Sequence, residues 1–308
     1  MADPEDNKTA APEESAPTEV PKARRGRRKK AAPAKVTKAK KEKAAPAAKP
    51  GQVHVYSTDG DVMKSVDLPA VFRSEVRTDL IRRAVTAFQA NRRQPYGPSP
   101  NAGMRHSVRW SGKGHGVSRV PRIRGTMIGA QAPGTVGGRR AHRPRVETVW
   151  AKKVNDHERR LARNAALAAL QDPSLVASRG HRFKDDITLP IVVEDRLESL
   201  EPDGGATRAG LAILDRLGLL PDVQRAKEGR HVRAGRGKMR GRRYRQPRSL
   251  LVVVKDAEKV RRLFGNLPGV EVVSPAGLNA EILAPGGAPG RLTVFSEGAL
   301  ETLRSWQP

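Results

Sequence analysis

Residues 91–145 have the composition that points most directly to a chemical function. These 55 residues include twelve Lys or Arg, ten Gly and six Pro, but no Asp or Glu. A solvated protein surface normally mixes both signs of charge. The apolar residues recur at neither helical nor strand spacing, and so long an irregular segment inside a domain is usually functional or disordered. The composition therefore predicts a surface that binds a polyanion.

The side chains of this stretch suit phosphates and unpaired bases. Guanidinium groups bind phosphate oxygens through paired hydrogen bonds, and rings among arginines, such as Tyr96, can stack on bases or anchor the chain locally. The glycines allow close approach of a phosphate to the backbone. The candidate nucleic-acid contacts are Arg92, Arg93, Arg105, Arg109, Trp110, Lys113, His115, Arg119, Arg122, Arg124, Arg139, Arg140, Arg143 and Arg145.

A second basic segment, residues 225–248, precedes an apolar strand pattern. It holds eleven basic residues and a single acid, Glu228. Its position predicts a second polyanion contact at one edge of a sheet. The candidates here are Arg233, Arg236, Lys238, Arg240, Arg242, Arg243, Tyr244, Arg245 and Arg248.

Neither glycine-rich motif fits a nucleotide-binding enzyme. Residues 235–241 read G-x-G-x-x-x-G, one residue longer than the dinucleotide fingerprint, and they precede a strand instead of following one. Lys113, in the sequence SGKGHG, is followed by Gly, and no helix pattern starts there as a phosphate-binding loop requires.

Other catalytic and metal-binding patterns are equally weak. The seven His form no H-x-x-x-H or H-E-x-x-H pair, and the absence of Cys excludes disulfides, thiol nucleophiles and Cys-ligated zinc. The acid pairs 185–186 and 194–195 flank a predicted strand, where turn and helix-cap roles are much commoner than catalysis. We expect no catalytic residue, no metal and no cofactor.

The whole chain is strongly basic. Its 308 residues carry a net charge of +27 with a pI near 11.2, which is typical of nucleic-acid-binding proteins. No apolar run approaches the roughly 20 residues that span a bilayer, and no secretory signal precedes the body. Residues 1–50, rich in Ala, Pro and Lys, predict a disordered arm.

The remaining residues predict an α/β globule. A hairpin is expected at residues 53–68 and helices at 78–90 and 155–170, on either side of the basic stretch. Strands at 190–193, 249–254, 270–273 and 291–295 alternate with helices at 206–217, 257–264, 278–283 and 297–306. This order predicts a mainly parallel central sheet of about four strands covered by helices. The expected parts are the arm 1–50, a globule of 51–90 and 146–308, and an extended loop, 91–145, inserted in it.

Three motifs, which follow one another in the same order as in the family, resemble the archaeal type of the L-four family of large-subunit ribosomal proteins. They are GRGKMRGRRYRQPRS at 235–249, LAPGGAPGRLTVF at 283–295 followed by SEGAL, and GGRRAHRP at 137–144. The resemblance covers roughly residues 53–306. The arm lies outside it, and the chain lacks the long basic C-terminal extension of eukaryotic members, which favours an archaeal, cytoplasmic protein.

The resemblance implies a structural protein of the large ribosomal subunit. It implies an α/β globule bound to large-subunit rRNA and an extension that helps to line the nascent-peptide exit tunnel, opposite the L-twenty-two family protein. The nascent peptide would pass the tip of the loop, which we expect near residues 111–137. Neither a membrane nor a small-molecule substrate is expected as a partner.

Two alternative functions come from other classes of protein. A DNA- or RNA-condensing chromatin-type protein would explain the Lys/Ala/Pro arm, but it gives no reason for an acid-free insert in a globule. A nucleotide-dependent α/β enzyme would need a glycine-rich turn from strand to helix, which the sequence lacks.

Overall fold

A six-stranded sheet forms the centre of the computed structural model, which describes residues 51–200 and 205–307. These residues belong to one compact unit, residues 44–308, and the arm expected at 1–50 lies outside the described residues. The strands lie in the order β2 (Val62–Asp67), β1 (Gln52–Tyr56), β5 (Ile191–Val193), β10 (Thr293–Ser296), β8 (Leu251–Val253) and β9 (Glu271–Val273).

The expectation of about four strands is wrong because the N-terminal hairpin joins the sheet. The four predicted apolar runs are β5, β10, β8 and β9, and they are neighbours. Strand β1 pairs in parallel with β5, with Val55 opposite Val192, while β2 pairs antiparallel to β1 as the outer strand. Five strands are therefore parallel to one another. The mainly parallel α/β architecture is confirmed.

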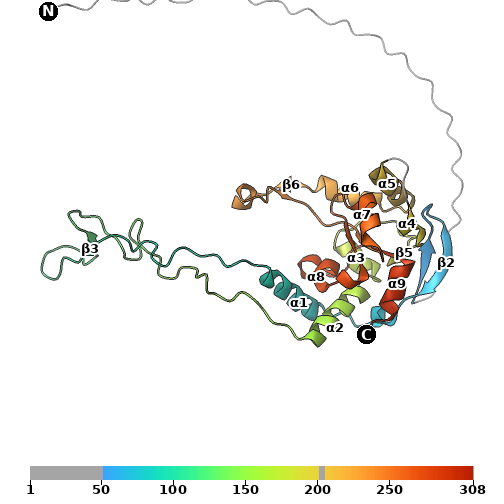
Figure 1. Ribbon diagram of the computed structural model, residues 1–308, viewed down its shortest axis with the longest axis horizontal. Coiled ribbons are helices and arrows are strands. Elements are labelled where there is room, and N and C mark those ends of the chain that lie inside the picture. The colour runs from blue at the N-terminus through green and yellow to red at the C-terminus, as the bar shows by residue number, and fades with distance from the viewer. Residues whose placement is uncertain (1–50, 201–204, 308) are drawn as a thin grey trace, which may run out of the picture. The chain divides into compact units, whose positions relative to one another are not determined.

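Helices cover both faces of the sheet, so the fold has three layers (Figure 1). Successive strand residues alternate between the two apolar cores. Val192 and Phe295 face one core, whereas Ile191 and Val294 face the other. Burial on both faces explains why these strands read as continuous apolar runs rather than alternating ones.

The first core lies under α1 (Thr78–Asn91), α2 (Asp156–Ala168), α8 (Ala280–Leu283), α9 (Glu297–Arg304) and the 3-10 helix η1 (Ala70–Arg73), and the 3-10 helix η3 (Pro275–Gly277) packs beside α9. The second lies under α3 (Pro173–Ser178), α4 (Arg196–Ser199), α5 (Ala206–Arg216), α6 (Leu220–Glu228) and α7 (Ala257–Phe264). The short η4 (Pro285–Gly287) packs beside α1 and α8.

Helices α1, α2, α5, α7, α8 and α9 confirm the helical predictions, whereas α3, α4 and α6 were not expected. Helix α6 extends into residues 225–228 of the segment that we expected to form a second polyanion contact. It does so because Val223 and Ala226 are buried in the second core. Arg225 consequently lies near the core rather than with the exposed arginines.

The chain leaves the globule at the end of α1 and returns at the start of α2 (Figure 1). We call residues 92–155 the extension. Alanines along α2, such as Ala162 and Ala165, are fully buried and let it pack against α1. The backbone N–H of Lys152 donates to Asn91 Oδ1 at 2.8 Å, which joins the two ends of the extension.

Candidate nucleic-acid interface

The extension consists of two arms joined by hydrogen bonds from side chains of one arm to backbone carbonyls of the other. Arg143 Nη1 donates to the carbonyl of Ser99 at 2.9 Å, and Gln131 Nε2 donates to the carbonyl of Met104 at 2.9 Å. A Cβ at Gly103, where φ is +78°, would lie 2.6 Å from the backbone nitrogen of Arg139. A larger residue would separate the arms, so this glycine permits their close approach.

A small folded unit stands at the far end of the extension from α1 and α2 (Figure 1). Strands β3 (Val108–Arg109) and β4 (Arg122–Ile123) pair antiparallel, and Ala130 is only 4% exposed. Sequence periodicity could not reveal strands of two residues. Between them, residues 110–121 carry the exposed side chains of Lys113, His115 and Arg119.

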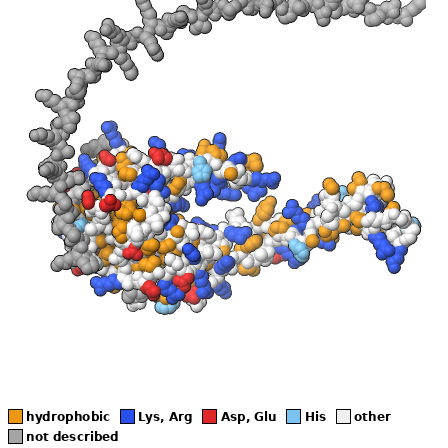
Figure 2. Space-filling model, turned by 180° about the vertical axis from the view of Figure 1, so that it is seen from behind, with side chains coloured by type: hydrophobic (Ala, Val, Ile, Leu, Met, Phe, Trp, Pro, Cys, Tyr) orange, Lys and Arg blue, Asp and Glu red, His pale blue; other side chains and the backbone are white. Residues whose placement is uncertain are grey.

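Nearly all the predicted contacts of the extension are exposed, and Lys and Arg side chains are visible along it (Figure 2). Only Arg122 and Arg143 are half-buried. The exposed ones are Arg92, Arg93, Arg105, Arg109, Trp110, Lys113, His115, Arg119, Arg124, Arg139, Arg140 and Arg145.

Four of these arginines also make contacts within the protein. Arg92 forms an ion pair with Glu281 of α8, and the guanidinium of Arg93 lies 3.7 Å from the ring centroid of Trp150. Arg122 donates to the carbonyl of Met127, and Arg143 ties the arms as described. These four arginines therefore stabilise the conformation of the extension and also contribute positive charge to its surface. Sequence reasoning missed Trp150 because an isolated ring carries no periodic signal.

The second basic segment is a hairpin that begins where α6 ends. We call residues 229–248 the basic loop. Strands β6 (His231–Val232) and β7 (Tyr244–Arg245) pair antiparallel, and η2 (Arg236–Met239) lies between them. The guanidinium carbon of Arg230 lies 4.2 Å from the centroid of the Tyr244 ring, which is a cation–π contact within the loop.

The predicted contacts of the basic loop are exposed except for Arg233, which is half-buried. Lys and Arg side chains gather at the end of the loop in Figure 2. The exposed set is Arg236, Lys238, Arg240, Arg242, Arg243, Tyr244, Arg245 and Arg248, of which Arg248 forms an ion pair with Glu271.

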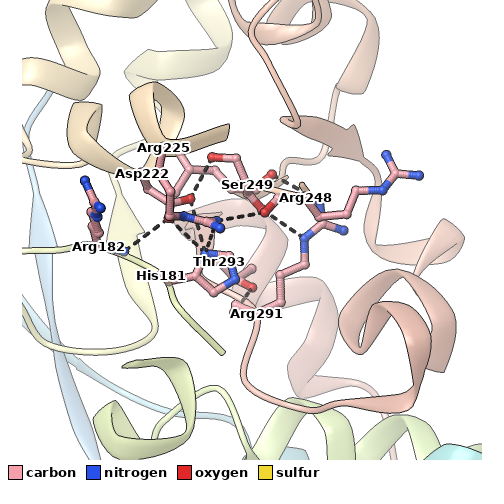
Figure 3. A network of polar contacts seen from close by, with 9 residues as sticks. His181, Arg182, Asp222, Arg225, Arg248, Ser249, Arg291 and Thr293 are labelled. Atoms are coloured by element: carbon pink, nitrogen blue, oxygen red, sulfur yellow. Dashed lines mark hydrogen bonds and ion pairs between the residues drawn. The ribbon is translucent and has the colours of Figure 1, made fainter. Parts of the chain in front are cut away.

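A buried polar network fixes the foot of the basic loop (Figure 3). Asp222 accepts from Ser249 Oγ at 2.7 Å and from Arg225 Nε at 2.9 Å, and it lies 3.1 Å from His181 Nδ1. Arg225 also donates to the carbonyl of Arg248 at 2.9 Å. The network therefore binds α6 to the start of β8, on both sides of the loop.

The pKa values of this network fit a structural role. Burial alone would raise the pKa of Asp222, but hydrogen bonds and charge from His181, Arg225 and Ser249 outweigh it and lower that pKa to about 2. Burial lowers the pKa of His181 despite the attraction of Asp222. The Ser249 hydroxyl donates to the aspartate and not to the histidine, so the three side chains lack the geometry of a nucleophilic triad.

A fully buried arginine, Arg291, extends the network across the N-terminal ends of β10, β8 and β9. Its guanidinium donates to Glu271 at 2.6 Å and to the carbonyls of Ser249 at 3.1 Å and Ile282 at 2.8 Å. Glu271 thereby joins Arg291 to Arg248 at the end of the loop. Nearby, burial and the charges of Arg291 and Arg225 lower the pKa of Arg179 to about 10.

The acid pair at the end of β5, Glu194 and Asp195, has structural partners. Glu194 accepts from Ser57 Oγ and the Thr58 N–H, and Asp195 accepts from the Gly298 N–H at 2.7 Å. This supports the turn and helix-cap interpretation of this pair. Within residues 51–200 and 205–307, His and acidic side chains form no group of three suited to a metal ion, and no helix is long and apolar enough to cross a membrane.

Comparison with known proteins identifies the family. Residues 66–306 match the model of the ribosomal protein L4/L1 family. The chain is 46% identical over 253 residues to the large ribosomal subunit protein uL4 of Thermoplasma acidophilum, covering 82% of this chain and 97% of that protein. Proteins of the same name from Methanopyrus kandleri and Halobacterium salinarum are 48% and 47% identical, each over 81% of this chain and over 96% and 98% of their own lengths. These relatives are of the archaeal type that the three motifs indicated, and the chain belongs to the ribosomal protein L4/L1 family.

Proposed function

We propose that this protein is a structural component of the large ribosomal subunit that binds and organises its rRNA. The observation that carries the proposal is the extension, which exposes basic side chains and contains no acid between residues 91 and 145. The relatives are named as proteins of the large ribosomal subunit. In this proposal the protein belongs to cytoplasmic ribosomes and has a structural role, which membership in the family supports.

In this mechanism, basic side chains of the extension and the basic loop neutralise the charge of rRNA phosphates. Exposed arginines and lysines of the extension and the basic loop replace the counterions of converging rRNA phosphates, while the globule holds the bases of both segments. Contacts such as that of Arg143 with Ser99 restrict the path of the arms before RNA is bound. The extension would become fully ordered on the RNA, as basic segments commonly do.

The position of the extension gives it a second role in this proposal. Family resemblance suggests that its end, with residues 110–121, helps to line the nascent-peptide exit tunnel opposite the L-twenty-two family protein. The exposed side chains of Trp110 and Val117 lie on this part of the chain and would meet the tunnel or its contents.

Sedimentation of native extracts on a sucrose gradient tests the proposal directly. We expect the protein to migrate with large subunits after nuclease-free lysis and to leave them in high salt. Protein that sediments free, or with DNA, would contradict a ribosomal role and favour a DNA-condensing function.

Binding of the purified chain to a large-subunit rRNA transcript supplies the second measurement. The logarithm of the binding constant should fall linearly and steeply with the logarithm of the salt concentration, because each neutralised phosphate releases a counterion. A nearly flat dependence between low and moderate salt would refute binding through these basic side chains.

A further inference from the structure

A groove of ≈ 550 Å³ lies where the base of the extension meets the basic loop. Arg93, Gln94 and Tyr96 line it from the extension, and Arg240 and Arg242 line it from the loop. Its volume falls within the about 300–1,000 Å³ typical of clefts that hold small ligands. Two segments that are far apart in the sequence therefore build one concave surface.

The aromatic side chain of the groove has an unusual environment. Tyr96 is 82% exposed as a whole residue, although aromatic residues normally bury most of their area. Such a ring gains hydrophobic contact when a flat partner covers it. Successive bases of single-stranded nucleic acid are partners of this kind.

One guanidinium of the groove is held in place. Arg93 lies over Trp150 with 3.7 Å between its guanidinium carbon and the ring centroid. Contact through the flat face restrains the group while leaving its in-plane N–H donors available for hydrogen bonds. The side chain is thus pre-organised for an anion, which reduces the entropy lost on binding.

The lining side chains complement the three parts of a nucleotide. Three arginines and no acid line the groove, which suits a phosphate. Tyr96 offers a stacking surface for the base. The amide of Gln94 carries both a donor and an acceptor for the edge of the base. A purely electrostatic surface would need neither the ring nor the amide.

We propose that this groove holds one unpaired nucleotide of the bound RNA. Its base stacks on Tyr96, and its phosphates lie between Arg93 and the loop arginines Arg240 and Arg242. A single RNA strand thus passes from the extension to the basic loop, which makes the two segments one interface. This inference rests on the proposed rRNA-binding function.

Paired substitutions of the ring test the stack. In filter binding to the large-subunit rRNA transcript, Tyr96→Ala should weaken binding by about 5- to 100-fold, whereas Tyr96→Phe should bind nearly as wild type, because base stacking needs only the ring. The salt slope should not change for either variant, since neither alters a charge. Tyr96→Ala within about twofold of wild type, or Tyr96→Phe as weak as Tyr96→Ala, would overturn the proposal.

The arginines give the complementary result. Arg242→Ala should lower the salt slope by about one, because one phosphate contact is lost. Arg304→Ala, which removes an exposed charge on α9, serves as the matched control and should change affinity by less than about twofold. An unchanged slope for Arg242→Ala would contradict a phosphate in the groove.

A double-mutant cycle asks whether both segments contact the same nucleotide. Combining Tyr96→Ala with Arg242→Ala should cost less than the product of the two single losses, because the first change already frees the nucleotide. Losses that multiply within about twofold would mean separate RNA contacts and would refute the single site. Failure of the wild-type chain to bind rRNA would instead refute the proposed function itself.

Discussion

The globule and the extension use charge in opposite ways. In the globule, ion pairs join separate elements, as Lys64 joins Glu297 and Arg216 joins Asp59. Throughout the described part of the extension beyond Arg92, no basic side chain between residues 93 and 145 has an acidic partner. Charge stabilises the fold in the first region and remains available to a partner in the second.

Apolar side chains show the same contrast. Of the large hydrophobic residues that are exposed in the described parts of the chain, Met63 alone belongs to the body of the globule, and the others lie on the extension or the basic loop. Examples are Val136 at 97% exposure and Met239 at 73%. The two projecting segments keep both charge and apolar area for intermolecular contacts. We therefore expect these side chains to be covered only when the protein is bound in a complex.

The contrast between structural charge in the globule and available charge in the extension predicts that the largest loss of stability follows a substitution of Arg291. Arg291→Ala should lower the free energy of unfolding by about 3 kcal/mol or more, because Glu271 loses a partner and the carbonyls of Ser249 and Ile282 lose their donor inside the core. Urea unfolding measures this loss. The exposed Arg304→Ala provides the control, and equal stability of the two variants would show that buried charge is not structural here.

A smaller effect is expected from acid titration of the network at the foot of the loop. The pKa of Asp222 is about 2 in the folded protein, compared with an ordinary value of 3.8. The carboxylate therefore contributes stability above about pH 4, and roughly 2 kcal/mol is lost as the pH falls towards 2. Unfolding measured over this pH range should show a smaller loss in Asp222→Asn.

His181, which lies next to Asp222, affects stability at higher pH than Asp222 does. Because the pKa of His181 is lowered in the folded state, the unfolded chain binds its proton first, and stability declines as the pH falls through about 6.5. His181→Gln should remove this upper part of the pH dependence and leave the lower part. If Asp222→Asn instead followed the wild-type curve at low pH, the network would not be the source of the acid loss.

The smallest effect on stability is expected from shortening the extension. Deleting residues 112–137 should leave the thermal melting of the globule cooperative and should change its free energy of unfolding by less than about 0.5 kcal/mol, because none of these residues belongs to either apolar core. Affinity for the rRNA transcript should nevertheless fall. Loss of cooperative melting would show that the globule needs the extension for its stability. The two regions would then not differ in the role that we assign to their side chains.

Periodic sequence patterns predicted the elements whose own residues are buried. Runs such as residues 270–273 and the apolar stripe of α1 were sufficient because burial repeats along them. The number of strands could not be obtained in this way, since the pairing of Val55 with Val192 joins distant segments. Helix α6 was missed because its basic residues concealed the short apolar face formed by Val223 and Ala226.

The character of the interface was predictable, but its internal contacts were not. The absence of acids marked the extension from composition alone. By contrast, Asp222 lies 41 residues from His181 and meets it only in the folded chain. Arg291 would be assigned to the surface from its residue type, yet it is fully buried. Trp150 became recognisable as a support for Arg93 only through their stacked geometry.

The bond between Lys152 and Asn91 has a consequence for the entropy of assembly. It joins residues 61 positions apart, and closing a flexible loop of that length costs about 3–4 kcal/mol in the length-dependent term alone. Packing of α1 against α2 closes this loop during folding of the protein. An RNA that binds the extension therefore needs to restrict only its internal torsions, because both ends already lie together.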